Sequence, residues 1–295
     1  MRHIDKTKAI LPPSFLKWLK DNDADLQDKI NDPSVTGSQI WTFFSQSTHV
    51  YRELKEALVA YQGYICCYCG QKIDLDGLTK IEHLFAKSKR EYKHLTLDFY
   101  NLLASCMGGC KLKAHVVKSG ETLEKIAALY SVDVEYLLDV WVNADEIKLF
   151  RERYDIENLS AGDRIIIFPV LPEPQQHCDT KKGNKEIDIH PLQTDCQEHF
   201  SYNPTNGEIV VTEKNKCTLK RLGLNNNRYI KQRRKNVIEE VADVIIENLV
   251  KDFGHSPSVF HANKTKIIDN LNNVTKSGGK LDPFVFVIIW RLNNY

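Results

Sequence analysis

The feature that most constrains this chain is the placement of its eight cysteines, which fall into short motifs far apart in the sequence. Cys66 and Cys69 form a Cys-x2-Cys-Gly motif, which is typical of a zinc knuckle. Two thiolates on such a tight turn can share one ion, and the glycine tolerates the backbone angles of the turn. A tetrahedral structural site needs two more ligands, which we predict to be Cys106 and Cys178.

Other residues leave alternatives open at this site. Cys110 competes for a ligand position because Cys106-x3-Cys110 is also a plausible ligand spacing. His177 adjoins Cys178 and is the first substitute for it. The remaining cysteines are interpreted as ordinary buried thiols, since free cysteine packs as a small hydrophobic residue: Cys67, Cys196 and Cys217.

We expect no targeting or membrane segment in this chain. Its first residues lack the apolar core of a signal peptide, and its apolar runs, such as Phe284 to Trp290, are far shorter than the roughly 20 residues of a membrane span. We therefore expect a cytoplasmic protein without membrane contact. Structural disulfides are rare in that compartment, so metal binding is the preferred explanation of the cysteines.

Further motifs lie between and beyond the cysteine pairs. Glu82-His83 stands in Ile-Glu-His-Leu-Phe, Asn101 begins Asn-Leu-Leu, and Asp179 and Lys182 stand in Cys-Asp-Thr-Lys-Lys-Gly. Together with the knuckle, and in this order, the motifs resemble HNH nucleases. They most closely resemble the PtuB family, the HNH endonuclease subunit of Septu anti-phage systems, which also accompanies some retrons.

The resemblance implies a fold and a biological setting. The expected class is α+β: an HNH ββα-metal (His-Me finger) core with a pair of zinc knuckles and flanking helices at both termini. His83 would end the first strand and Asp179 would start the helix. An ABC/SMC-like ATPase would act with the nuclease in phage defence, and retron-linked relatives add RNA, including tRNA, to DNA as a substrate class.

The residue types suit phosphodiester hydrolysis, which needs an activated water and a cation on the scissile phosphate. We predict His83 as the general base, and Glu82 and Asp179 as oxygen ligands of a catalytic Mg²⁺ or Mn²⁺ beside the structural Zn²⁺. Asn101 would orient the loop that carries His83, or His83 itself. Lys182 is either a phosphate contact or a solvated helix residue.

A self-contained pattern separates Cys106 from Cys178. It opens with His115-Val116-Val117-Lys118-Ser119-Gly120-Glu121-Thr122-Leu123 and closes with Ala161-Gly162-Asp163-Arg164-Ile165-Ile166-Ile167, which resembles a βααβ LysM-like domain. LysM domains usually bind N-acetylglucosamine-containing glycans. Residues 115–172 hold six basic and eleven acidic residues, so phosphate repulsion opposes nucleic-acid contact there. We favour a protein-interaction or substrate-gating role over glycan binding; a passive insertion remains an alternative.

These motifs divide the chain into an N-terminal helical region (1–60), a split HNH core (61–114 and 173–212), the LysM-like insertion (115–172) and a C-terminal helical region (213–295). Within the N-terminal helical region, the polar stretch 21–38 is predicted to be a loop.

The C-terminal helical region begins with a basic stretch: residues 213–235 hold nine basic residues and one acidic residue. Five of these cations are predicted nucleic-acid contacts: Lys220, Arg221, Arg228, Arg233 and Arg234.

Two other classes of function compete with the nuclease. One is a zinc-stabilised nucleic-acid or partner-binding module without catalysis. The other is an envelope protein that uses the LysM-like domain to hold cell wall, which the missing signal peptide disfavours. The presence of His83 together with Glu82 and Asp179 favours the metal-dependent endonuclease.

Overall fold

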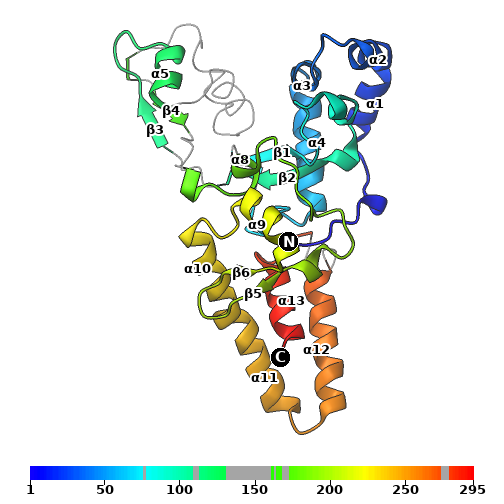
Figure 1. Ribbon diagram of the computed structural model, residues 1–295, viewed down its shortest axis with the longest axis vertical. Coiled ribbons are helices and arrows are strands. Elements are labelled where there is room, and N and C mark those ends of the chain that lie inside the picture. Colours follow the sequence, from blue (N-terminus) through cyan, green and yellow to red (C-terminus); the bar gives the residue numbers. More distant parts are fainter. Residues whose placement is uncertain (76–77, 109–112, 131–160, 163, 168–172, 274–278) are drawn as a thin grey trace.

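The computed structural model describes residues 1–75, 78–108, 113–130, 161–162, 164–167, 173–273 and 279–295 (Figure 1). Helices and small two-stranded antiparallel sheets give the expected α+β class. None of the helices in these ranges is long and apolar enough to cross a membrane.

Four helices precede the first strand: α1 (Pro13–Asp21), α2 (Asp23–Asn31), α3 (Gly37–Ser45) and α4 (Thr48–Tyr61). The prediction of a loop over residues 21–38 is wrong for α2. Asp23 and Asp25 place negative charge in the first turn of this helix, where the helix dipole favours it, and Leu26 is its buried anchor. One buried residue in nine is too weak a pattern to be read as a helix from the sequence.

The centre of the molecule is a strand–strand–helix unit. β1 (Thr79–His83) pairs antiparallel with β2 (Leu102–Cys106), in a register that sets His83 opposite Leu102 and Thr79 opposite Cys106. The 3-10 turns η2 (Arg90–Leu95) and η3 (Phe99–Asn101) lie between the two strands. The short helix α8 (Cys178–Lys182) lies beside β2, and the hydroxyl of Thr180 donates to the carbonyl of Met107 just after that strand.

The insertion leaves and re-enters the body at one point. The amide of His177 donates to the carbonyl of Gly108 at 2.9 Å, so the chain ends on either side of residues 109–176 meet. Gly108 has φ +63°, and a Cβ there would lie 1.4 Å from the carbonyl oxygen of His177. Only glycine permits this approach, which brings α8 next to β2 despite the long intervening segment.

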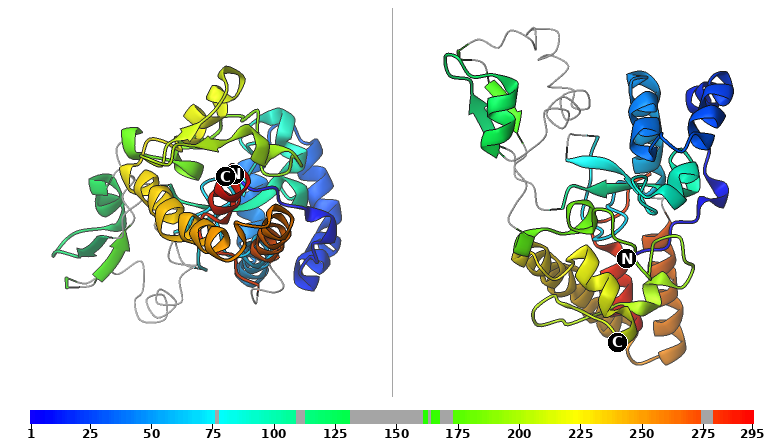
Figure 2. Two further views of the ribbon diagram at one scale, coloured as in Figure 1. Left: turned by 90° about the horizontal axis from the view of Figure 1, so that it is seen from below. Right: turned by 45° about the horizontal axis from the view of Figure 1, so that its top comes forward.

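Part of the insertion is described. β3 (Lys113–Val116) pairs antiparallel with β4 (Arg164–Ile167), and α5 (Leu123–Tyr130) follows β3, with the hydroxyl of Thr122 accepting from the amide of Lys125. Figures 1 and 2 show this unit on the outside of the molecule, away from the C-terminal helices. The expected second helix falls on residues outside the described ranges.

After α8 the chain forms a small hairpin and a helical region. η4 (Glu173–Gln175) precedes α8, and β5 (Ser201–Tyr202) pairs with β6 (Ile209–Val210), as the turn residues between them predict. The helices are α9 (Lys216–Leu222), α10 (Arg228–Val237), α11 (Asp243–Phe253), α12 (Pro257–Asn272) and α13 (Val285–Asn293). A π-helical turn, Ile238–Ala242, joins α10 to α11, and the Asn227 side chain caps α10 as its sequence predicts.

α13 is the apolar centre of this C-terminal region. Its residues Val285 to Ile289 are all buried, and it packs among α10, α12 and β5. It also reaches the knuckle, because the amide of Phe284 donates to the carbonyl of Gly70 at 2.8 Å. The final apolar segment is therefore part of the core.

Candidate functional site

Four cysteine thiols converge from three parts of the chain. Cys66 and Cys69 come from the turn after α4, Cys106 from the end of β2, and Cys178 from the start of α8. All four are buried, and their sulfurs lie within 4.8 Å of one another. The Sγ–Sγ distance is 3.9 Å for Cys66–Cys178 and 3.8 Å for Cys69–Cys106.

These distances fit a tetrahedral metal site. Four sulfurs bound at about 2.3 Å to a central zinc ion are separated by about 3.8 Å from one another. The thiol cluster, as we name Cys66, Cys69, Cys106 and Cys178, could therefore hold a metal such as zinc. The four predicted cysteines are the ones brought together, whereas Cys110 lies outside the described residues. His177 is buried beside the cluster, with Nδ1 3.1 Å from the sulfur of Cys178.

The thiols of the cluster differ from one another in acidity: the pKa is lowered for Cys66 and Cys69 and raised well above its usual value for Cys106 and Cys178. Burial disfavours a thiolate at Cys66, yet hydrogen bonds from the other cluster thiols bring its pKa well below the usual value. Cys67 is buried without such donors, and burial raises its pKa well above normal. Cys67 therefore behaves as the ordinary buried thiol expected, while the lowered pKa of Cys66 favours its thiolate, the form that binds a cation.

The backbone of the knuckle is held on two sides. The amide of Gly70 closes the turn onto the carbonyl of Cys66 at 3.0 Å, and the amide of Cys67 donates to the carbonyl of Ala104 in β2 at 3.1 Å. Gly70 has φ +74°, and a Cβ there would lie 2.1 Å from the ring of Phe286. The knuckle is thus attached to the strand that also carries Cys106.

A pair of acidic side chains lies next to the thiol cluster. Glu82, on β1, is only 4% exposed, and Asp179, the second residue of α8, is within hydrogen-bond reach of it. Burial, and then the proximity of Asp179, raise the pKa of Glu82 well above its usual value. Two carboxyl groups at this distance either share a proton or bind a cation between them.

Two donors reach the same oxygen of the Glu82 carboxylate. The Lys182 ammonium lies 2.6 Å from Oε1, and the Tyr68 hydroxyl donates to the same oxygen at 3.0 Å. Lys182 is 1% exposed and also donates to the carbonyl of His83 at 2.9 Å. The Lys182 ammonium is already bonded to two protein oxygens, those of Glu82 and the His83 carbonyl. We therefore assign Lys182 the role of holding Glu82, in place of the direct phosphate contact considered from the sequence.

His83 ends β1 and is turned toward the N-terminal helices. Its Nε2 lies 3.0 Å from the carbonyl oxygen of Thr96, which can only accept, so Nε2 carries the proton and Nδ1 is the basic nitrogen. The ring of Trp41 meets the imidazole edge-to-face, with 4.6 Å between centroids. Burial, and then the charge of Lys87, lower the pKa of His83 well below its usual value, which keeps the ring neutral.

His83 does not join the two carboxylates in a compact ligand triad. Among the described residues, the thiol cluster alone brings three or more His, Cys, Asp or Glu ligand atoms within 4.8 Å of one another. Glu82 and Asp179 are together, and Lys182 links them to the main chain of His83. The imidazole is therefore not grouped with the carboxylates, since it contacts Thr96 and Trp41 instead.

Asn101 holds the loop that follows β1. Its side-chain amide donates to the carbonyls of Phe85 and Leu95, both at 3.0 Å, and its Oδ1 accepts from the amide of Phe85 at 2.7 Å. Its own carbonyl accepts from the amide of Leu84. These four bonds match the first of the two roles predicted for Asn101, orienting the loop that carries His83.

The five predicted nucleic-acid contacts differ in how exposed their side chains are. Arg234 is fully buried, and its guanidinium donates to the carbonyls of Gly207 and Leu224 and to the side chain of Asn225. It cannot reach a phosphate, so that prediction is wrong for Arg234. Lys220 and Arg228 are exposed, which leaves them available.

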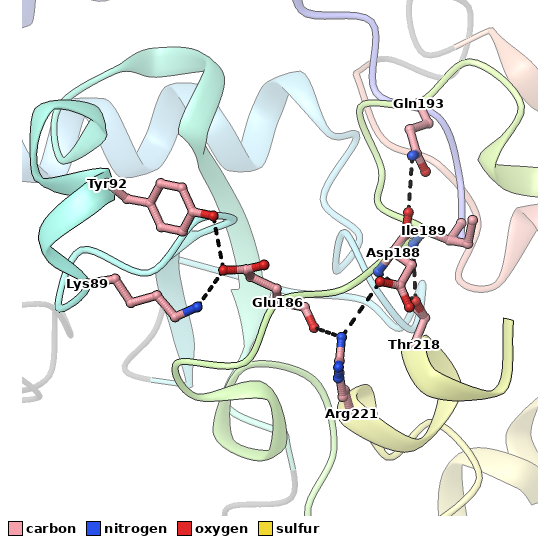
Figure 3. A network of polar contacts seen from close by, with 8 residues as sticks. All are labelled: Lys89, Tyr92, Glu186, Asp188, Ile189, Gln193, Thr218 and Arg221. Atoms are coloured by element: carbon pink, nitrogen blue, oxygen red, sulfur yellow. Dashed lines mark hydrogen bonds and ion pairs between the residues drawn. The ribbon is translucent and has the colours of Figure 1, made fainter. Parts of the chain in front are cut away.

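Arg221 and Arg233 are partly engaged. Arg221 donates to the carbonyl of Glu186 at 2.7 Å and pairs with Asp188 at 3.7 Å, within the network of Figure 3. In the same network the Glu186 carboxylate accepts from Lys89 and Tyr92. Arg233 lies over the ring of Tyr229, 5.3 Å from its centroid.

Sequence reasoning missed Tyr68, Thr96 and Trp41. Tyr68 carried a usable signal, because it lies between the two cysteines of the knuckle, where a buried phenol needs a hydrogen-bond partner. Thr96 acts through its carbonyl, which any residue possesses, and Trp41 comes from a helix remote in sequence. Nothing local identifies either of these two.

The comparisons with known proteins bear on the insertion. The family model of the LysM domain matches residues 115–140, which include the end of β3 and all of α5. The match agrees with the LysM-like domain predicted from the sequence, and LysM domains are binding modules. No curated protein matches the chain.

Proposed function

We propose that this protein is a metal-dependent HNH endonuclease that hydrolyses phosphodiester bonds of nucleic acid. The observation that carries the proposal is the arrangement on β1, β2 and α8. There the carboxyl pair of Glu82 and Asp179 lies next to the thiol cluster, and a neutral, buried His83 follows Glu82 in β1. The order of strand, strand and helix agrees with the ββα-metal core that the sequence resembles.

The residues divide the chemistry between them. Nδ1 of His83 accepts the proton of the attacking water, because its Nε2 proton is held by Thr96. Glu82 and Asp179 are the oxygen ligands that would hold Mg²⁺ or Mn²⁺, a cation that stabilises charge on the scissile phosphate. The thiol cluster would hold Zn²⁺ and fix Cys178 immediately before Asp179.

Cleavage by the purified full chain tests the proposal directly. Supercoiled DNA and tRNA are incubated with the zinc-loaded protein in Mn²⁺ or Mg²⁺, with a matched EDTA sample. We expect cleavage that needs the divalent cation and is lost in His83→Ala. Cleavage that survives both EDTA and His83→Ala would contradict the proposal.

The substrate and partners follow from the family resemblance. We propose anti-phage defence as the setting and an ABC/SMC-like ATPase as the partner that directs cleavage, with DNA as the first substrate and tRNA as the alternative. Adding such an ATPase to the cleavage assay should change the rate or the choice between DNA and tRNA. The LysM-like insertion is proposed as a protein-interaction surface.

A second candidate is a zinc-stabilised module that binds nucleic acid or a partner without cleaving it. The observation that favours it is burial: His83 is 5% exposed, and Glu82 is already paired with Lys182. Nucleic-acid binding that is equal in wild type and His83→Ala, with no cleavage in either, would support this candidate.

A further inference from the structure

Tyr68 connects the knuckle to the carboxyl pair. It stands between Cys66 and Cys69, is completely buried, and donates its hydroxyl to Oε1 of Glu82 at 3.0 Å. A buried phenol of this size contributes to packing whether or not its hydroxyl is bonded. The direction of this hydroxyl toward a carboxylate is what distinguishes Tyr68 from an ordinary core aromatic residue.

Both donors to Glu82 act on the same oxygen. The Tyr68 hydroxyl and the Lys182 ammonium reach Oε1 from different elements, the knuckle and α8. Two donors on one carboxylate oxygen restrict rotation of the carboxylate and leave the lone pairs of Oε2 for a cation shared with Asp179.

The hydroxyl is itself held in place by the knuckle. Cys67 donates to the carbonyl of Ala104 on β2, and Cys66 lies against Cys178 of α8. Tyr68 is thus fixed relative to both elements that carry the carboxyl pair, since β1 pairs with β2 and Asp179 follows Cys178.

We propose that Tyr68 is a positioning residue that orients Glu82 for the catalytic cation, so that the zinc knuckle also shapes the second metal site. The inference rests on the proposed function. It extends the knuckle's role beyond structural support: the turn that supplies two thiols also supplies the donor that sets the geometry of an oxygen ligand.

The test measures Mn²⁺ affinity of the zinc-loaded full chain by calorimetry without nucleic acid. Tyr68→Phe removes only the hydroxyl and keeps the ring in the core. We expect Mn²⁺ affinity to fall about tenfold, the usual loss when a partner of a metal ligand is removed. Bound zinc and the melting temperature report whether the knuckle stays intact.

Tyr202→Phe is the matched control, because Tyr202 is also buried but its hydroxyl lies near the amino group of Met1. It should leave Mn²⁺ affinity unchanged. Unaltered affinity in Tyr68→Phe, or an equal loss in Tyr202→Phe, would overturn the positioning role.

Glu82→Gln separates this inference from the proposed function. If Glu82→Gln binds Mn²⁺ like the wild type, the cation site itself is refuted. If Glu82→Gln loses Mn²⁺ while Tyr68→Phe retains it, only the positioning role fails. As a further readout, raising Mn²⁺ should restore cleavage in Tyr68→Phe but not in His83→Ala, whose defect is the missing base.

Discussion

The thiol cluster with its adjoining carboxyl pair and the basic stretch 213–235 were both predicted to carry function, and they behave in opposite ways. Residues as far apart as Cys66 and Cys178 meet within 3.9 Å. Arg233 and Arg234 are neighbours in sequence, yet one lies over a tyrosine ring and the other is buried under the hairpin.

The difference has a physical cause. Soft thiolates gain their stabilisation only by sharing one ion, so their side chains must converge wherever they stand in the chain. Cations of a single helix have no such requirement. A helix turns about 100° per residue, and adjacent side chains therefore face different surroundings.

The largest expected effect is at the thiol cluster. Cys69→Ser, or removal of zinc by a strong chelator, should abolish cooperative folding of the body, because structural zinc contributes on the order of 10 kcal/mol to folding. Zinc content and thermal unfolding by circular dichroism measure this. Cys217→Ser, outside the cluster, is the control. A Cys69→Ser protein with the melting temperature and zinc content of the wild type would contradict a structural role of zinc at the thiol cluster.

His83→Ala should lower the cleavage rate by about 10²- to 10⁴-fold, the usual contribution of a general base. Mn²⁺ affinity should remain, because the imidazole is not grouped with the carboxylates. His94→Ala, at an exposed position, is the matched control for both measurements. Loss of Mn²⁺ binding in His83→Ala would show that the imidazole is a ligand.

The variants Arg234→Met and Arg228→Met compare a core residue of the basic stretch with a surface residue. Arg234→Met should destabilise folding by roughly 3 kcal/mol, because the charged hydrogen bonds to Gly207, Leu224 and Asn225 are lost. Arg228→Met should leave the melting temperature unchanged and reduce the salt dependence of nucleic-acid binding by about one phosphate contact. The reverse pattern would overturn the assignment of both residues.

The smallest expected effect is a pH dependence at Glu186. Hydrogen bonds from Lys89 and then Tyr92 lower the pKa of this carboxyl below 4.5 in the folded protein. Because the folded pKa is the lower one, the contribution to stability is present above pH 4.5 and is lost as pH falls through the folded pKa. The melting-temperature advantage of wild type over Glu186→Gln should therefore shrink in acid. An advantage that is constant with pH would exclude the ion pair as its source.

Local sequence determined the parts of this protein whose chemistry is local. The knuckle spacing and the other two cysteines identified the cluster, and the Asn206-Gly207 turn of the β5–β6 hairpin and the Asn227 cap of α10 are likewise local signals. These predictions succeed because ligand preference, turn conformation and helix capping depend on a few neighbouring residues.

Tertiary structure decided what each polar group does once the elements pack. It directed Lys182 and Tyr68 to the same oxygen of Glu82, set Trp41 and Thr96 around His83, and buried Arg234. A side chain's partner and exposure depend on segments distant in the chain, and a buried polar group must satisfy its hydrogen bonds with whatever packing brings near. Sequence therefore named the four cysteines of the thiol cluster, and packing decided which donors reach Glu82.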